Sequence, residues 1–443
     1  MLNHIWLALL LIGVTVAAVT GQTRAAVDGA IKASETAVTL ALGLVGVMTL
    51  WLGIMRLAER SGLVQLLART LRPVLARLFP EVPPEHPAMA SMMLNIAANM
   101  LGLTNAATPF GLRAMRDLDR LNPRPGTATN AMCTFLAINT GSVQLIPASA
   151  IAVLAASNSL NPTAIVGSTL LATTCSSAVG LLTCKLLERL PRFRLSPADA
   201  APDGTVAPAA VPDPEETPGA PPPPLKPAGR LALAALLLGV VALVLTTAFP
   251  DLVGRSLDAA SAARPAWVRV LDALSLAAIP FLLAFFPLYA ALRRVPVYEE
   301  FVEGAKEGFQ VAVRIIPYLV GMLVAIGLLR GSGAIEFVSN LLRAPLAAVG
   351  FPVELLPITL IRPLSGSASL AAFSDVVATH GADSLLARMA GTLFGSTETT
   401  FYVVAVYFGS VAVRRVRHAV WAGLAADVAG ILAAVFVCRW MFG

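Results

Sequence analysis

The chain has 443 residues, of which 57% are hydrophobic and 13% are charged. Soluble domains carry about 25% charged residues, so this composition excludes an ordinary globular protein and predicts an all-α, polytopic transmembrane helical bundle in contact with the lipid bilayer. The net charge of +6 does not indicate a nucleic-acid partner, because no basic run is interleaved with aromatic residues. Lys and Arg in cytoplasmic loops explain it.

The sequence carries no signal for an enzyme, a cofactor or a metal site. Its four cysteines, Cys133, Cys175, Cys184 and Cys438, are scattered through apolar segments without metal-ligand spacing. Walker, His-Glu-Xaa-Xaa-His and Ser-His-Asp patterns are missing from these segments. We therefore expect no catalytic residue and no cofactor.

In chain order, residues 2–20 are apolar and should form an uncleaved first helix, because the basic n-region of a signal peptide is missing. Residues 36–55 form an uncharged second span. In residues 56–79, leucines recur at helical spacing opposite several arginines. This pattern predicts an amphipathic helix that lies in the membrane interface, although a solvated helix packed on the bundle would show it too.

The next apolar segment, residues 88–112, contains amide side chains. Asn95 and Asn99 are four residues apart and share one face of the predicted helix. The stretch from Asn105 through Thr108 to Pro109 should break that helix with polar groups.

Residues 125–184 form the longest uncharged run and should hold two spans joined near 157–162. The first of these spans contains Asn139 and Thr140. Single polar residues often only join transmembrane helices by hydrogen bonds, but their concentration beside Gly and Pro favours a binding site.

Residues 195–228 are rich in Pro, Ala and acidic residues and cannot bury a core, so they predict a flexible linker. The linker divides the chain into membrane halves 1–194 and 229–443. Basic clusters on both of its sides favour the cytoplasmic face. The second half begins with uncharged spans at 231–249 and 273–292.

Two polar motifs, Arg362-Pro-Leu-Ser-Gly-Ser367 and Gly395-Ser-Thr-Glu-Thr-Thr400, interrupt the apolar sequence of this half, and each contains one charge. A central Arg or acidic residue costs about 2.5–3.5 kcal/mol in a membrane span, so such residues usually face a bundle interior or a watery cavity. An Arg–Glu pair that only locks helices together is the alternative. The candidate residues of these motifs are Arg362, Ser365, Ser367, Ser396, Thr397, Glu398 and Thr399. The last span, 419–436, contains Asp427, a weaker candidate.

The second half resembles the first. Val302-Glu-Gly-Ala305 matches Val27-Asp-Gly-Ala30, and further matches keep their order at an offset of about 270 to 275 residues. With this alignment, residues 95–109 fall opposite 362–369, and 134–142 fall opposite 392–400. Corresponding interruptions in two repeats mark the central site of many transporters. The sequence leaves open whether the repeats are parallel or inverted.

Longer motifs carry a family resemblance. Asn95-Ile-Ala-Ala-Asn-Met-Leu-Gly102 and Asn130-Ala-Met-Cys-Thr-Phe-Leu-Ala-Ile-Asn-Thr140 resemble the spore maturation protein A family. Phe301-Val-Glu-Gly-Ala-Lys-Glu-Gly-Phe309 and the two motifs around Arg362 and Glu398 resemble spore maturation protein B. The chain thus looks like a fusion of two members of the nucleoside-recognition or Gate family. The resemblance implies Gate-type repeats, a bacterial inner-membrane location and solute movement, and it does not supply a substrate.

Two functional hypotheses follow. In the first, a secondary transporter binds a small polar solute at the membrane midplane between Asn95, Asn99, Asn105 and Thr108 of one half and the Arg362 and Glu398 motifs of the other. Glu398 would then take up a proton or cation, and Arg362 would balance its charge. In the second, the chain is a non-transporting scaffold or sensor in envelope or spore-maturation-like processes. Either hypothesis is compatible with self-association of the chain.

Overall fold

The computed structural model describes residues 2–102, 104–193, 225–254, 266–348 and 350–443. These residues form helices, together with one isolated β-bridge between Thr127 and Arg415. Among them, the helices long and apolar enough to cross a membrane are α2 (Thr23–Arg60), α8 (Ile165–Leu187), α9 (Pro227–Ala248), α12 (Val297–Gly331) and α18 (Ala419–Phe442). The chain is therefore an all-α, multi-pass membrane protein, as predicted.

Shorter helices fill the space around these spans. Apolar helices α1 (Leu2–Thr20) and α11 (Ala266–Leu292) pack on α12 and α9, respectively. The other helices are α3 (Leu63–Leu78), α4 (Pro87–Met100), α5 (Thr104–Arg120), α6 (Asn130–Gly141), α7 (Ala148–Ala156), α13 (Ala334–Ala348), α14 (Leu356–Ile361), α15 (Gly366–His380), α16 (Leu385–Ser396) and α17 (Thr400–Gly409).

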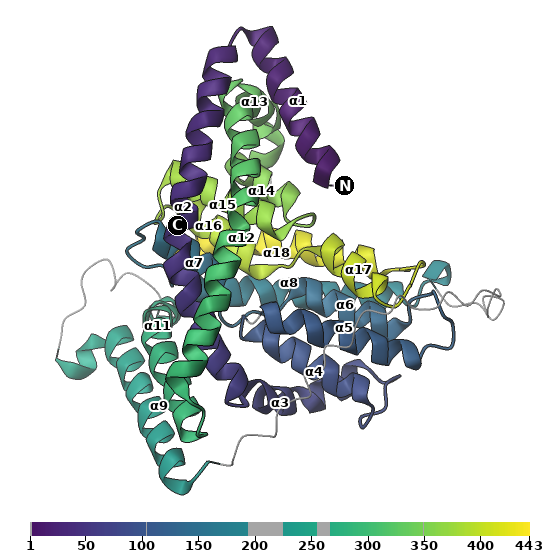
Figure 1. Cartoon of the computed structure of the whole chain (residues 1–443), viewed down its shortest axis with the longest axis vertical. Helices are drawn as coiled ribbons and strands as arrows, with labels where there is room; N and C mark the ends of the chain where they lie inside the picture. The colour runs from purple at the N-terminus through teal and green to yellow at the C-terminus, as the bar shows by residue number, and fades with distance from the viewer. Residues whose placement is uncertain (1, 103, 194–224, 255–265, 349) are drawn as a thin grey trace.

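The two longest helices, α2 and α12, lie side by side along the long axis of the molecule (Figure 1). They run antiparallel, because Gly29 of α2 meets Gly327 of α12 while Leu52 meets Gly304. A Cβ atom at Gly304 would lie 2.6 Å from the Leu52 carbonyl oxygen. Glycine is thus required where the two backbones touch, as is usual between close-packed membrane helices.

This helix pair has an internal two-fold relation. At the sequence offset that relates Val27 to Val302, the counterpart of Gly29 in the second repeat is Gly304. At the same offset, the counterpart of Gly327 in the first repeat is Leu52. Both pairs are in contact. The repeat detected in the sequence is therefore present in three dimensions.

Each repeat also contains a broken helix, α6–α7 in the first and α16–α17 in the second. The end of α17 meets the start of α6, because the Arg414 amide donates to the Gly126 carbonyl at 2.9 Å. At the other end, the loop after α7 meets the loop before α16, since Ser159 Oγ donates to Asp383 Oδ1 at 2.7 Å. The broken helices therefore run in opposite directions, and the repeats are inverted.

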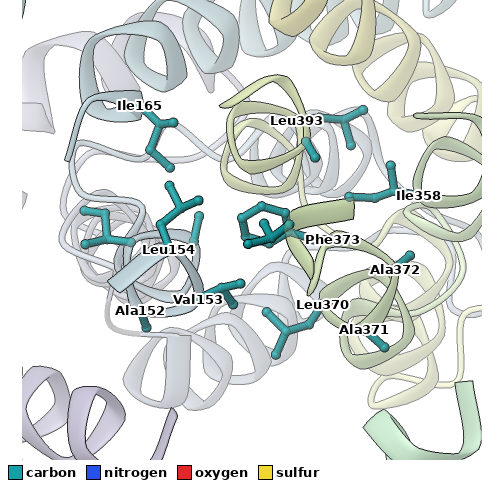
Figure 2. Close-up of a cluster of buried hydrophobic side chains, with 14 of the residues drawn as sticks. Ala152, Val153, Leu154, Ile165, Ile358, Leu370, Ala371, Ala372, Phe373 and Leu393 are labelled. Carbon is teal, nitrogen blue, oxygen red and sulfur yellow. The ribbon is translucent and has the colours of Figure 1, made fainter. Parts of the chain in front are cut away.

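A core of small and branched apolar side chains joins α7 to the second half. Figure 2 shows Val153 and Leu154 of α7 near Phe373 of α15, with Leu393 of α16 and Ile358 of α14 beyond. Phe373 and Leu393 are fully buried. This packing fixes the positions of the two broken helices relative to each other.

Several boundaries differ from the sequence prediction. Helix α2 includes the polar residues before the predicted span at 36–55, because Gly29 gives this part of the helix a packing partner in α12. In the first repeat the helix is broken at Gly102, whose φ of +76° is left-handed, and the stretch predicted as the break lies inside α5. The predicted linker 195–228 lies outside the described residues up to 224, and α9 already begins at Pro227.

The amphipathic segment predicted at 56–79 forms helix α3 only from Leu63 onwards, because residues 56–60 still belong to α2 and Gly62 turns the chain between the two helices. Ala68 and Leu75 are buried, whereas the side chains of Arg69 and Arg72 are exposed. Helix α13 occupies the corresponding place in the second half, and it is followed by a bend of 115° into the segment that contains α14. Both repeats therefore have an amphipathic helix before their first polar break.

Candidate functional site

The two broken helices meet at their breaks. Helix α6 ends at Gly141, where Ser142 adopts a left-handed φ of 32°, and helix α16 ends at Ser396 before an extended Thr397. The Glu398 amide donates to the Thr140 carbonyl at 2.8 Å, and Gln144 Nε2 donates to Glu398 Oε1 at 3.2 Å. The polar motifs of the two halves are therefore in direct contact.

The place where the breaks of α6–α7 and α16–α17 meet is called the crossing. A second helix interruption in each repeat, α4–α5 in the first and α14–α15 in the second, holds it in position. The Leu145 amide donates to the Met100 carbonyl at the end of α4, and the Phe401 amide donates to the Pro363 carbonyl between α14 and α15. The two bonds occupy equivalent places in the repeats. Four helix interruptions thus converge on one region, and helix ends of both polarities point into it.

Arg362 lies fully inside the protein, with 3% of its surface exposed. Its guanidinium group donates to the Thr397 carbonyl and, at 3.2 Å, to Thr397 Oγ1, and it lies 4.5 Å from the centre of the Phe394 ring. Glu398 and Asp427 act on its charge from a greater distance. The guanidinium of Arg362 is therefore hydrogen-bonded to the backbone at the break of α16–α17. Within the described residues it makes no ion pair with Glu398.

The amide residues of the first half form a connected cluster. Asn99 Nδ2 donates to Asn139 Oδ1 at 3.0 Å, and Asn139 Oδ1 also accepts from the Tyr407 hydroxyl at 3.4 Å. Asn95 Nδ2 donates to the Ala107 carbonyl and to the Tyr407 oxygen, at 2.7 and 3.1 Å. Tyr407 belongs to α17, so this cluster joins both repeats.

A third polar contact joins α18 to the break of the second repeat. Asp427 has 1% of its surface exposed, and its Oδ2 accepts from Thr400 Oγ1 at 2.6 Å. Thr400 is the first residue of α17, next to the break. The sequence pointed only weakly to Asp427, because a single acid in a terminal span can also serve to pair helices.

The remaining predicted residues lie at or near the breaks. Ser365 caps α15 by accepting from the Ala368 amide at 3.2 Å, and Ser367 Oγ is 3.4 Å from Ser365 Oγ. Ser396 is buried and donates to the Leu393 carbonyl. Thr399 is buried against Gly366.

Two predicted residues, Asn105 and Thr108, sit in the first turns of α5, after the break at Gly102. Thr108 is half-buried there. The side chain of Asn105 lies outside the described part of the chain.

Several buried oxygen atoms near the crossing have no hydrogen-bond partner among the described residues. They are Asn95 Oδ1, Thr140 Oγ1, Ser142 Oγ, Thr169 Oγ1, Ser177 Oγ and Asp427 Oδ1. Buried polar atoms in folded proteins nearly always have a partner, so each of these calls for one. Their grouping around the helix breaks indicates a region that binds polar ligands or water.

Outside the spans, Asp383 joins the two repeats. Its partial burial acts to raise the pKa, but hydrogen bonds from the Leu160 amide, the Ser159 hydroxyl and the Asn161 amide outweigh this effect and hold the pKa of the carboxyl below its usual range. The ionised form of Asp383 therefore stabilises the contact between the ends of α7 and α16.

Tyr407 and Gln144 are the site residues that the sequence prediction did not select. Tyr407 lies in an apolar helix, where an aromatic residue is usually part of the core. Its hydroxyl approaches Gly111 so closely that a Cβ there would lie 2.2 Å away. The sequence alone does not show that Gly111 faces Tyr407, because this contact depends on the packing of α5 against α17. Gln144 follows Thr140 closely in the sequence, but its contact with Glu398 depends on the crossing.

Fold and site together define a multi-pass membrane protein built from two inverted, Gate-type repeats with a shared polar centre. The Gate family, described as nucleoside recognition, matches residues 41–158 and 312–414. The chain is 46% identical over 176 residues to spore maturation protein B of Bacillus subtilis (strain 168), which covers 40% of this chain and 99% of that protein. It is 43% identical over 176 residues to spore maturation protein A of the same organism, with 40% and 90% covered. The chain belongs to the spore maturation protein family, and it combines A-like and B-like parts as a fusion.

Proposed function

We propose that this protein is a secondary carrier that moves a small polar solute through the crossing of its two broken helices. The observation that carries the proposal is the contact of Glu398 with Thr140 and Gln144, which brings interrupted helices of opposite direction together. Non-helical backbone inside a membrane is tolerated only where protein or a water-lined cavity surrounds it. In inverted-repeat transporters such backbone forms the binding site.

The solute should be uncharged and rich in hydrogen-bond donors. Arg362 is already engaged by Thr397 and Phe394, so its guanidinium is not free to hold an anion. The groups left at the crossing are mainly acceptors, namely the Glu398 carboxylate and Asn95 Oδ1. Hydroxyl- and amide-bearing metabolites fit this chemistry, and nucleosides are among them, in agreement with the description of the Gate family.

The contacts at the two ends of the broken helices suggest how access could alternate. One end is closed by backbone hydrogen bonds between Gly126 and Arg414, and the other by Asp383 with Ser159 and Leu160. Each contact joins one repeat to the other. Opening one while the other stays closed would expose the crossing to one side only, which is how inverted repeats rock around a central site.

We place the carrier in the bacterial inner membrane, with lipid against its exposed apolar side chains. Leu231 and Leu238 of α9 are 73% and 69% exposed, as expected for a lipid-facing helix. The names of the relatives add a role in spore maturation for those proteins. A carrier could serve such a role through the solute that it moves.

The test begins with the metabolites of cells that lack or overproduce the protein. Compounds whose levels differ, together with a panel of tritiated ribonucleosides, are then measured for uptake into proteoliposomes. We expect at least one to be taken up by the wild type and lost in Glu398→Gln, which keeps the shape of the side chain but removes its charge. Glu303→Gln is the matched control, because Glu303 is exposed on α12 and pairs with Lys306.

A protein that inserts normally but moves none of these compounds would contradict the carrier proposal. Equal uptake by the wild type and Glu398→Gln would remove Glu398 from the site. If substitutions in the polar motifs instead changed only which proteins copurify with the chain, the scaffold hypothesis would replace the carrier.

A further inference from the structure

One face of α18 lines the crossing with two glycines and an acid. Gly423, Asp427 and Gly430 lie on consecutive turns of this helix and share a face. A Cβ at Gly430 would lie 2.5 Å from Thr397 Cγ2, so the helix approaches the break of the second repeat closely. A Cβ at Gly423 would lie 3.3 Å from both Thr140 Oγ1 and Thr400 Oγ1. Hydroxyl groups from both repeats therefore converge beside Asp427.

These oxygens are buried and incompletely paired. Asp427 Oδ2 accepts from Thr400, but its Oδ1 has no partner among the described residues. Thr140 is fully buried, and its Oγ1 also has no hydrogen-bond partner among the described residues. The Thr140 carbonyl, by contrast, already accepts from the Glu398 amide. The Thr140 hydroxyl therefore lies beside the Thr400 hydroxyl that donates to Asp427, and Thr140 Oγ1 and Asp427 Oδ1 both have lone pairs available.

With both carboxyls ionised, the charges at the crossing would not balance. Arg362, Glu398 and Asp427 act on one another within the protein, and they would then supply one positive and two negative charges. Buried charges are stable only when they are paired or neutralised. Among the described residues no second basic side chain acts on Asp427, so one positive charge is missing.

The other ionisable groups on the helices packed against α18 do not supply it. They are Cys133 of α6, Cys175, Cys184 and Lys185 of α8, Arg388 of α16, and Tyr402 and Tyr407 of α17. Lys185 lies in the last turn of α8 and pairs with Glu188, and Arg388 stacks on Phe442 near the end of α18. Both cations are thus remote from the middle of α18.

We propose that Asp427, with Thr140 and Thr400, binds one monovalent cation, a sodium ion or a proton, which neutralises the crossing. The donors are all oxygen atoms, which suit a hard cation and not a transition metal. The C-terminal end of α6, with its partial negative charge, lies beside Thr140 and favours a cation at the same place. The role of this cation as the coupling ion rests on the proposed carrier function, whereas its binding does not. The cation is thus assigned to Asp427, and Glu398 is left for the solute.

The test measures cation binding by the full chain in lipid nanodiscs, with no solute added, so that it is independent of transport. Thermal unfolding is followed by tryptophan fluorescence over a range of pH, with sodium replaced by choline at constant ionic strength. For a sodium site we expect a saturable rise of several degrees in the melting temperature that potassium does not reproduce. For a proton site the melting temperature falls as the pH rises, whether or not sodium is present.

Two variants separate the site from a general salt or pH effect. Asp427→Asn removes the excess negative charge and should abolish either dependence. Asp375→Asn is the matched control, since Asp375 pairs with Arg330 away from the crossing, and it should keep the dependence of the wild type. Thr140→Val should weaken a sodium response, and Thr140→Ser should retain it.

The proposal is overturned if the wild type responds to neither sodium nor pH, or if Asp427→Asn responds as the wild type does. A carrier that failed in transport but passed this test would still have the cation site. A carrier that passed in transport and failed here would be uncoupled or coupled elsewhere.

Discussion

The glycine seam between α2 and α12 offers the clearest test of the two-fold architecture. We consider Gly304→Ala, because the added Cβ would lie 2.6 Å from the Leu52 carbonyl oxygen, 2.7 Å from Arg56 Cβ and 3.0 Å from Gly53 Cα. Two of these neighbours are backbone atoms of a long helix and cannot turn aside. The helices must separate, and overpacking of this kind costs about 1–3 kcal/mol.

The matched control is Gly239→Ala in α9, where a Cβ would have no atom within 4 Å. Both variants gain about 1 kcal/mol of helix propensity from the loss of glycine, so the difference between them isolates the packing cost. The assay is unfolding in detergent micelles with increasing SDS. Gly304→Ala should unfold earlier than Gly239→Ala, and Gly29→Ala should resemble Gly304→Ala because it occupies the equivalent place. If Gly304→Ala is as stable as the control, the close contact of α2 and α12 is wrong.

Three further predictions address the site and its ends. Arg362→Met should cost about 1–3 kcal/mol, because it leaves the buried carbonyl and hydroxyl of Thr397 without their charged donor. Size-exclusion profiles should show loss of the monodisperse protein, with Arg362→Lys less affected, and a normal profile for Arg362→Met would contradict this role. Asp383 has a pKa below the ordinary value of 3.8, so its contribution to stability is present above that pH and should be lost as the pH falls further. The loss of stability with falling pH should therefore be less steep in Asp383→Asn than in the wild type. Identical acid-unfolding profiles would argue against the contact. Tyr407→Phe removes the hydroxyl that joins Asn95 and Asn139, and we expect this to destabilise the protein by about 1 kcal/mol. It should also reduce transport more than the control variant Tyr402→Phe, whose side chain is exposed. Equal transport by the two variants would place the amide cluster outside the solute path.

Much of the fold could be predicted from the sequence, because both signals that define it are local. Long uncharged segments gave the spans, and polar residues beside Gly or Pro gave the breaks around Ser142 and Thr397. The length of α2 could not be predicted in this way. Its first part contains charged residues such as Asp28, and only contact with α12 through Gly29 makes a single long helix favourable.

The site was predicted less completely, because its geometry depends on the direction of the repeats. Arg362 and Glu398 were expected to balance each other across a cavity, but the inverted arrangement places Glu398 against Thr140 and Gln144 of the other repeat. Arg362 holds Thr397 instead. Tyr407 and Asp427 join the site only through the pairing of α17 and α18 with α4 and α6, which no local pattern reports.

The most direct measurement of the central claim is a cross-link between the two breaks. In a chain whose native cysteines are replaced, Cys is introduced at Gln144 and Glu398, whose side chains are 3.2 Å apart, and a protease site is placed in the linker. A short bis-maleimide reagent, which spans the distance that the shorter cysteine side chains leave between them, should keep the two halves together after proteolysis, as it should for a positive control with Cys at Arg56 and Glu300. If the control pair cross-links and the pair at the breaks does not, the broken helices do not meet, and the shared polar centre does not exist.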